Sequence, residues 1–352
     1  MPQDKYRRKT YVMLMTVLHT FICAFRYQFL TGDLIKYNTE FRHLRDVGYF
    51  SDQAIHEWKN TGFSWMMKFV GDTTGGNYQA LLIVLAVICC CIAGVFVYRY
   101  SPKPWFSFVV WNCMSFYLTY DFLAIKQGLA MAILMLSMMC IFEKKPVWFL
   151  IWTLLAGFIH MPALCFLPAY FLANRKLNKE MILFYLFSAV VIFYSRNQIV
   201  NLVGEIYYED SSFTLRKGEL GGRTIVILMI LVAGFLLKGF REKRFSQLFN
   251  IIVVAAIFQM FSGFDNIFTR LADYYLQFTV LFIPMIFYDV KGSEINRLAA
   301  PPMFPFNSRS RKLLAACIVL VLIWWYDTTM LGHTISNQVD NYLNYRFMWD
   351  VK

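Results

Sequence analysis

Long apolar runs alternate with short polar turns along the whole 352-residue chain. A helix needs about 20 apolar residues to cross the hydrocarbon core of a bilayer, and inside that span it satisfies its own backbone hydrogen bonds. The pattern therefore predicts an all-α polytopic integral membrane protein with about 10–11 crossings. The expected spans are residues 10–30, 78–98, 105–120, 122–142, 147–173, 181–194, 224–237, 245–261, 274–288 and 313–326.

The run 147–173 is too long for one comfortable span, and basic pairs flank it, Lys144-Lys145 before and Arg175-Lys176 after. Because cytoplasmic loops are enriched in Lys and Arg, both ends of the run are predicted to lie in the cytoplasm. A hairpin of two short helices that turns at His160-Met161-Pro162, near the outer face, satisfies this condition. A single tilted span with a kink at Pro162 is the alternative.

The segments outside the spans complete a single membrane domain over residues 1–352. The basic N-terminus is predicted to stay in the cytoplasm, and the first apolar run lacks a small-x-small cleavage site, so it is expected to remain as a span. Loop 31–76 is then an outer loop, in which residues 63–70 have the pattern of a short interfacial helix. Loop 195–222 and the tail 327–352 are also predicted to lie outside.

Composition supports this class and excludes others. Hydrophobic residues make up 58% of the chain and charged residues only 16%, whereas a soluble domain carries about a quarter charged residues. The net charge of +12 comes from Lys and Arg in short loops, which is the pattern that orients membrane proteins, so no nucleic-acid partner is expected. All eight Cys fall inside apolar runs without the spacing of a zinc site or a disulfide pair.

Ionisable residues gather near the predicted outer ends of the spans. Such groups are costly in a membrane and usually mark a functional site. Arg offers a bidentate fork to phosphate oxygens, Lys offers a point charge, and neutral His accepts a proton near pH 7. Together they are suited to hold a lipid-linked pyrophosphate and to activate a hydroxyl group. The set consists of Arg26, Lys126, His160, Arg223 and Arg270, with the carboxylates of Asp33 and Asp273 nearby.

Each of these residues also has a structural interpretation. Arg26 and Lys126 lie near span ends, where long basic side chains reach the lipid headgroups. His160 is placed to hydrogen-bond the hairpin turn, and Arg223, after two glycines, is typical of an interfacial anchor. The others have local explanations: Arg270 has Asp273 one helical turn later, and Asp33 follows Gly32 in a turn.

Short motifs extend from these residues over most of the chain. They read Phe25-Arg26-Tyr27 with Thr31-Gly32-Asp33, Gly76-Asn77-Tyr78-Gln79, Lys126-Gln127-Gly128-Leu129-Ala130, His160-Met161-Pro162-Ala163, and Arg270-x-x-Asp273-Tyr274-Tyr275. In these motifs the chain resembles the EpsG-like family of bacterial exopolysaccharide and capsule proteins, regarded as Wzy-type polymerases. Two positions depart from the family's pattern: Lys126 stands where Arg is usual, and Pro162 stands where Ser or Thr is usual.

The resemblance implies a polymerase that joins undecaprenyl-pyrophosphate-linked oligosaccharide repeat units into exopolysaccharide, capsule or O-antigen-type polymer. It places this enzyme in the bacterial cytoplasmic membrane, with the active site facing outward and with a flippase and a chain-length regulator as partners. It implies no cofactor and no metal, because cations stabilise the leaving group. The implied site residues are Arg26, Lys126 and Arg270 for the pyrophosphate, Gln127, Tyr274 and Arg223 for further substrate contacts, and His160 for the proton, with Asp33 as its substitute.

Two other functions fit a membrane protein of this kind. A glycosyltransferase that adds single sugars from a polyprenyl monophosphate favours acidic catalytic residues and a metal. A flippase or transporter for lipid-linked oligosaccharides favours cations through the bilayer centre or paired repeats with broken helices, neither of which the sequence shows. The glycosyltransferase would use the acidic residues of the first outer loop, Asp33, Glu40, Asp46 and Asp52.

Overall fold

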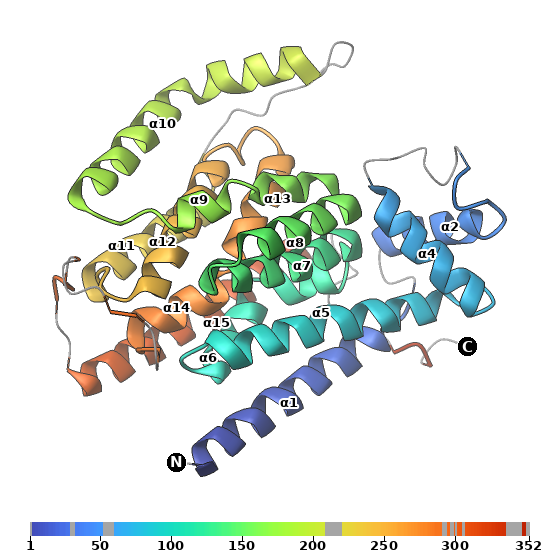
Figure 1. The fold of residues 1–352 in the computed structure, drawn as a ribbon, viewed down its shortest axis with the longest axis horizontal. Helices are drawn as coiled ribbons and strands as arrows, with labels where there is room; N and C mark the ends of the chain where they lie inside the picture. Colours follow the sequence, from blue (N-terminus) through green and yellow to red (C-terminus); the bar gives the residue numbers. More distant parts are fainter. Residues whose placement is uncertain are drawn as a thin grey trace. The chain divides into compact units, whose positions relative to one another are not determined.

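The computed structural model is helical throughout the part of the chain that it describes. Among those residues there is no strand, only two isolated β-bridges. The expected all-α polytopic membrane architecture is confirmed (Figure 1). Two compact units make up the chain, residues 1–164 with 314–352, and residues 165–313. The described residues are 2–28, 32–51, 60–207, 220–290, 294–295, 299, 301–304, 307–335 and 347–349.

Three described helices are long and apolar enough to cross a membrane by themselves. They are α5 (Tyr78–Tyr100), α7 (Ile125–Phe142) and the segment Glu180–Asn201 of α10 (Lys179–Tyr207). Three apolar stretches are shorter, Pro146–Ile159, Met161–Ala173 and Gly222–Leu237. The number of crossings stays a prediction. Parts of the predicted outer loop 195–222 and of the tail 327–352 lie outside the described residues.

Helix α1 (Pro2–Ala24) packs along α5 in the first unit (Figure 1). The Arg8 guanidinium donates hydrogen bonds to the carbonyl oxygens of Tyr98 (2.6 Å) and Ser101 (2.7 Å). Carbonyls at a helix C-terminus lack partners within the helix and carry negative partial charge, so a cation there stabilises α5. The prediction of a first span over 10–30 is wrong at its end, because the helix stops at Ala24 and the chain then turns.

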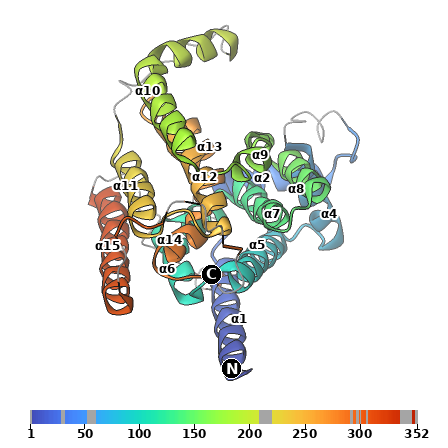
Figure 2. The ribbon, with the colours of Figure 1, turned by 60° about the vertical axis from the view of Figure 1, so that its left-hand side comes forward.

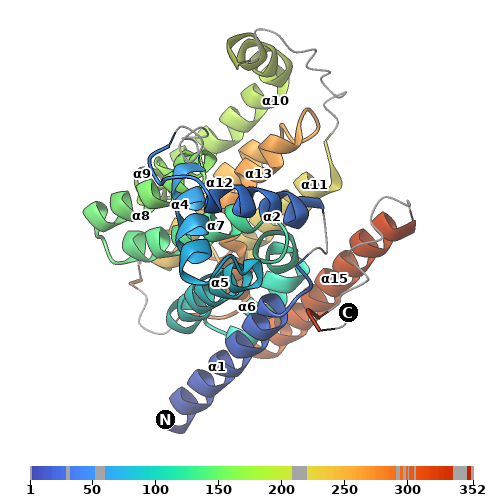
Figure 3. The same ribbon diagram turned by 90° about the vertical axis from the view of Figure 1, so that its right-hand side faces the viewer.

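The first long loop contains two helices, α2 (Gly32–Arg45) and α4 (Thr61–Thr73), which pack against each other (Figure 3). Helix α4 confirms a helix at 63–70 and extends it, whereas α2 was expected to be loop. The buried Lys68 ties the pair together: its Nζ donates to the Leu44 carbonyl (3.3 Å) and pairs with Asp72 (3.3 Å). The described part of loop 31–76 is therefore largely helical, with α2 and α4 packed together.

Helices α7 and α8 (Pro146–Ile159) form an antiparallel hairpin (Figure 1). At its centre the Thr153 hydroxyl donates to the Ser137 hydroxyl (3.1 Å), and both side chains are fully buried. Its turn is closed by Glu143, which accepts from Lys145 (2.6 Å) and from the Tyr100 hydroxyl (2.9 Å). These hydrogen bonds lower the pKa of the Glu143 carboxyl.

The apolar run 147–173 is interrupted at His160, as expected. Helix α8 ends at Ile159, a 3₁₀-helix follows over Met161–Phe166, and α9 spans Ala169–Ala173. Gly157 permits the turn, because a Cβ there would lie 2.6 Å from Cγ of Leu164. Whether the two pieces cross the membrane as a hairpin stays a prediction.

The connection from α6 (Pro104–Cys113) to α7 is irregular. The predicted span 105–120 ends early, and after Ser115 in a left-handed conformation (φ 62°) the chain forms a π-helix over Tyr117–Asp121. Helix α7 begins only at Ile125, three residues later than the expected span. This irregular segment supplies part of the site described below.

The second unit is organised around α12 (Lys243–Gln259), which packs against α13 (Asn266–Leu276) and α14 (Thr279–Phe287) (Figure 2). Phe245 and Phe282 stack at its centre, with ring centroids 4.8 Å apart. The buried Asn250 side chain donates to the carbonyl of Leu172 (3.0 Å) and so caps the end of α9. Helix α11 (Gly222–Leu237) also belongs to this unit, whereas α15 (Ser308–Ile335) belongs to the first unit from Leu314 onward.

Candidate functional site

Arg26 is the most unusual residue of the first unit, because its side chain is completely buried. Its Nη1 donates to the carbonyl oxygen and to Sγ of Cys23, and its guanidinium lies 4.9 Å from the centre of the Phe122 ring. Its Nε and Nη2 are buried and have no hydrogen-bond partner among the described residues. Burying a charged donor without a partner is costly. The two unused donors therefore suit an anion with more than one oxygen.

The segment that carries Arg26 is held by the start of α5. Asn77 caps α5 by accepting from the backbone N–H of Gln79 (3.0 Å). The buried Gln79 side chain then donates to the carbonyl oxygens of Ala24 (2.6 Å) and Arg26 (3.3 Å). The motif Gly76-Asn77-Tyr78-Gln79 thus has a structural role: it fixes the backbone on which Arg26 stands.

A second support comes from the far end of the chain. The backbone N–H of Met348 donates to the Phe25 carbonyl (2.9 Å), and Phe347 forms an isolated β-bridge with Arg26. The rings of Phe347 and Trp349 stack with centroids 4.6 Å apart and lie against Phe21 and Phe25. Residues 347–349 therefore belong to the surroundings of Arg26, which no sequence motif had indicated.

Lys126 is in the first turn of α7, where α2 and α4 meet that helix. Its Nζ lies 5.7 Å from the ring centre of Tyr37 and 5.8 Å from that of Phe63, both within the range of a cation–π contact. No side chain caps the start of α7. A cation near a helix N-terminus is unfavourable, since that end carries positive partial charge. An anion bound beside Lys126 would remove this conflict.

Tyr78 connects Arg26 with the surroundings of Lys126. Its hydroxyl donates to the Leu34 carbonyl at 3.0 Å, which ties α5 to α2. It also interacts electrostatically with Arg26, Tyr37 and Glu40. Gln127 is buried beside these groups, with 3% of its surface exposed. The sequence motifs around residues 26, 77 and 126 therefore converge on one region of the first unit.

His160 lies at the same end of the α7–α8 hairpin as Lys126. The contact between Ser137 and Thr153 sets the register, which places His160 at the level of Ala130, one helical turn from Lys126. The backbone of His160 donates to Ala156 (2.8 Å) and accepts from Ala163 (2.9 Å). The turn is thus held by the backbone of His160. Its partly exposed ring remains a candidate for chemistry.

Asp33 is exposed in the first turn of α2. A carboxylate at that position is stabilised by the positive end of the helix. This gives Asp33 a structural role, and its role as the substitute base stays a prediction. Asp52, from the acidic set of the first loop, lies outside the described residues.

The other candidate residues belong to the second unit. Arg223, at the start of α11, forms an ion pair with Asp273 of α13, in which both guanidinium nitrogens contact the carboxylate. Asp273 is buried (1% exposed), and Arg223 is partly buried (28% exposed). Asp273 therefore pairs with Arg223 of another helix, which the sequence did not indicate, and its ion pair with Arg270 stays a prediction. Tyr274 is fully buried, whereas Arg270 is exposed.

Asp121 is a residue of this region that the sequence motifs passed over. It closes the π-helix, and its backbone carbonyl accepts from Cys23 Sγ (3.1 Å), the same sulfur that Arg26 contacts. A signal was present in the sequence, since Asp121 and Lys126 are the only charged residues between Trp105 and Phe142. An isolated acid in a run of that length is the type of residue that marks function.

Gly128, two residues after Lys126, packs directly against the backbone of Tyr120, so this position has no room for a side chain. A Cβ at this position would lie 2.7 Å from the carbonyl carbon of Tyr120 and closer still to its oxygen. These are backbone atoms of the π-helix and cannot move aside. We expect Gly128→Ala to destabilise the protein by about 1–3 kcal/mol, measured by thermal unfolding of the purified protein in detergent. Gly48→Ala, where a Cβ meets open space, is the control and should unfold like the unchanged protein.

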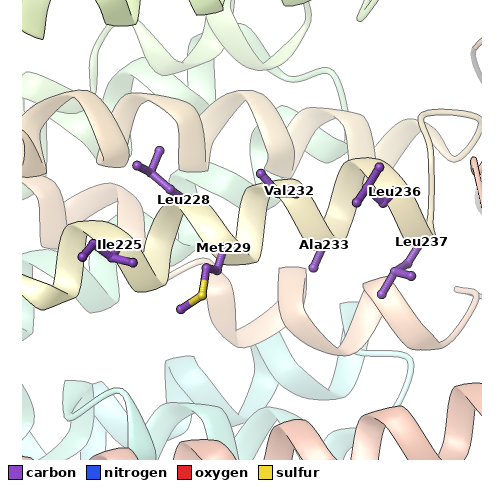
Figure 4. A pocket seen from close by; sticks show the side chains of 7 residues that line it. All are labelled: Ile225, Leu228, Met229, Val232, Ala233, Leu236 and Leu237. Carbon is purple, nitrogen blue, oxygen red and sulfur yellow. The ribbon is translucent and has the colours of Figure 1, made fainter.

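The second unit carries an apolar groove along α11 (Figure 4). None of its seven lining side chains is polar or titratable, so the groove offers no chemistry and is suited to lipid chains. They are Ile225, Leu228, Met229, Val232, Ala233, Leu236 and Leu237.

Comparison with known proteins gives one match. A family model described as the EpsG family matches residues 9–347, nearly the whole chain. No curated protein and no solved structure matches. The matched span contains every candidate residue discussed above, from Arg26 to Tyr274. The chain therefore belongs to the EpsG family, a family of Wzy-like polymerases that act in polysaccharide biosynthesis.

Proposed function

We propose that this polymerase joins undecaprenyl-pyrophosphate-linked oligosaccharide repeat units into a surface polysaccharide. The growing chain is transferred from its lipid carrier to a hydroxyl of a new lipid-linked unit, and undecaprenyl pyrophosphate is released. The reaction takes place on the outer face of the bacterial cytoplasmic membrane, with the N-terminus of the enzyme in the cytoplasm. A flippase supplies the repeat units, and a chain-length regulator acts with the enzyme.

Arg26 is the observation that carries this proposal. It is a permanent cation with two buried donor nitrogens, Nε and Nη2, that no group in the described part of the chain uses. A pyrophosphate offers several oxygens and negative charge, so it satisfies both donors and offsets the cost of burying the guanidinium. In a dry site such donors stabilise the charge that develops on a leaving group far more than they do in water.

Other residues are proposed for the remaining roles in the reaction. Lys126 adds a second cation at the start of α7, held over the rings of Tyr37 and Phe63. Since pyrophosphate leaves without protonation, the site needs no acid and no metal beyond these charges. Gln127, Arg223, Arg270 and Tyr274 are proposed to contact the lipid-linked oligosaccharide. One further group must take the proton of the acceptor hydroxyl, and the sequence nominates His160, with Asp33 as its substitute.

The test is the length of the surface polymer in cells that carry Lys126→Ala. Loss of one pyrophosphate contact slows transfer by about 10²–10³-fold, so single repeat units should accumulate on lipid at the outer face. Lys126→Arg should retain polymer, because the cation is kept. Lys36→Ala, which removes an exposed Lys of α2, is the matched control.

Three results would contradict the proposal. Unchanged polymer length, at equal protein levels in the membrane, would make Lys126 a structural residue. Incomplete repeat units would favour the glycosyltransferase that adds single sugars. Complete units trapped on the inner face would favour the flippase.

A further inference from the structure

The segment between α6 and α7 has an unusual backbone conformation, with one residue at positive φ and a π-helix. Ser115 adopts a positive φ of 62°, which residues with a side chain rarely do. Further along the same segment, the backbone N–H groups of Phe122 and Ala124 donate to the carbonyl oxygens of Tyr117 (3.1 Å) and Thr119 (2.9 Å), each five residues back. Such π-helical turns are rare and occur often at functional sites. Here the distortion determines where Asp121 stands.

Asp121 is held next to Arg26 through shared neighbours. Cys23 contacts both: its Sγ donates to the Asp121 carbonyl (3.1 Å) and lies 2.9 Å from Nη1 of Arg26. Phe122, the next residue after Asp121, provides the ring under the guanidinium at 4.9 Å. Arg26 and Asp121 interact electrostatically, yet the guanidinium donates no hydrogen bond to the carboxyl. The Arg26 guanidinium and the Asp121 carboxyl are therefore close together without forming a hydrogen bond to each other.

The pKa of the Asp121 carboxyl group is also suited to proton transfer. Its burial raises the pKa of Asp121 to about 8, against the lowering effect of the Arg26 guanidinium. The segment 114–124 that carries Asp121 connects α6 and α7 and lies outside both helices. The other described groups that interact electrostatically with Asp121 are thiols and one phenol: Cys23 of α1, Cys89 and Cys90 of α5, and Tyr117 of the π-helix. A base is most effective when its pKa is close to the working pH.

We infer that Asp121, and not His160, is the base that takes the proton of the acceptor hydroxyl, while Arg26 holds the pyrophosphate beside it. This inference rests on the proposed function. The acceptor oxygen forms a bond to the anomeric carbon of the growing chain, and the bond from that carbon to the pyrophosphate oxygen breaks. The bonding pair leaves with the pyrophosphate, whose charge Arg26 stabilises. The proton passes to the Asp121 carboxylate, which returns it to water.

The inference is tested with the full-length protein in lipid nanodiscs and lipid-linked repeat units as substrate. Asp121→Asn keeps the shape of the neutral carboxyl but cannot accept a proton, so kcat should fall by about 10²–10⁴-fold with KM changed little. Inhibition by added undecaprenyl pyrophosphate should persist in Asp121→Asn and weaken in Arg26→Lys. Lys36→Ala, at an exposed position of α2 in the same unit, should retain the activity of the unchanged enzyme.

The pH profile separates a base from a structural residue, and it does not depend on how well a variant folds. In the unchanged enzyme kcat/KM should rise about tenfold per pH unit up to about pH 8, because only the ionised carboxylate accepts a proton. This limb should remain in His160→Ala and vanish in Asp121→Asn. A flat profile in the unchanged enzyme overturns the inference, as does full activity in Asp121→Asn. An unchanged enzyme that makes no polymer at any pH contradicts the proposed function itself.

Discussion

Replacing Arg26 by Ala is expected to abolish polymer formation, with a loss of at least about 10²–10³-fold in the rate of transfer. The guanidinium is fully buried, and its Nε and Nη2 have no protein partner, so the side chain has charge and donors available for a substrate. The rate is measured as repeat units joined per enzyme, with lipid-linked units supplied in excess. Arg42→Ala, at an exposed position on α2, is the control that should retain activity.

Arg26→Lys tests whether the geometry matters as well as the charge. A Lys ammonium is a point charge and cannot present the two donors of a planar fork. We therefore expect this variant to lose most of the activity although the positive charge is kept. Arg26→Met, which fills the same space without charge, should unfold within about 1 kcal/mol of the unchanged protein, because it removes an uncompensated buried cation. Strong destabilisation by Arg26→Met would show that the residue is structural.

Removal of Arg223 is expected to have the largest effect on stability. Its guanidinium pairs with the Asp273 carboxylate, which is only 1% exposed. Breaking a buried ion pair by removing one partner typically costs about 3–5 kcal/mol. We expect Arg223→Ala to approach that cost, measured by unfolding in detergent. Arg241→Ala, which removes an exposed cation of the same unit, should change stability little.

A double variant distinguishes the ion pair from a substrate contact. Arg223→Leu with Asp273→Leu replaces both charges by apolar groups, which is often neutral for a buried pair. Its stability should recover most of what Arg223→Ala loses. If the double variant is stable but makes no polymer, the pair also serves the substrate. If it makes normal polymer, Arg223 is structural, and its proposed contact with the substrate is wrong.

The helical class was predictable because hydropathy reports directly which segments are apolar enough for a bilayer. Helix α5 matches its expected span closely for this reason. Helix α2 was missed, since its apolar residues are spaced along one face and separated by charges. Leu34, Phe41 and Leu44 are buried against neighbouring helices, while the rest of the segment reads as a polar loop. A hydropathy average does not resolve such a face.

The candidate site was predictable only in part. Arg26 and Lys126 stand out in sequence as charges near apolar runs, and the structure gives both a defined environment. The support from Gln79 and from residues 347–349 depends on contacts between distant segments, which no local pattern specifies. Asp121 lies between the expected spans 105–120 and 122–142, where hydropathy alone gives it no role. The π-helix that directs it toward Arg26 arises from tertiary packing, including the close approach of Gly128 to Tyr120.

The hydrogen bond between Phe25 and Met348 joins two segments that are synthesised far apart in time. Helix α1 is synthesised long before residues 347–349, which bridge to its end. The surroundings of Arg26 therefore stay incomplete during translation until that distant segment has been made. A variant that ends before residue 347 would carry the helices but not the finished surroundings of Arg26, and we expect it to form little polymer even when it inserts correctly.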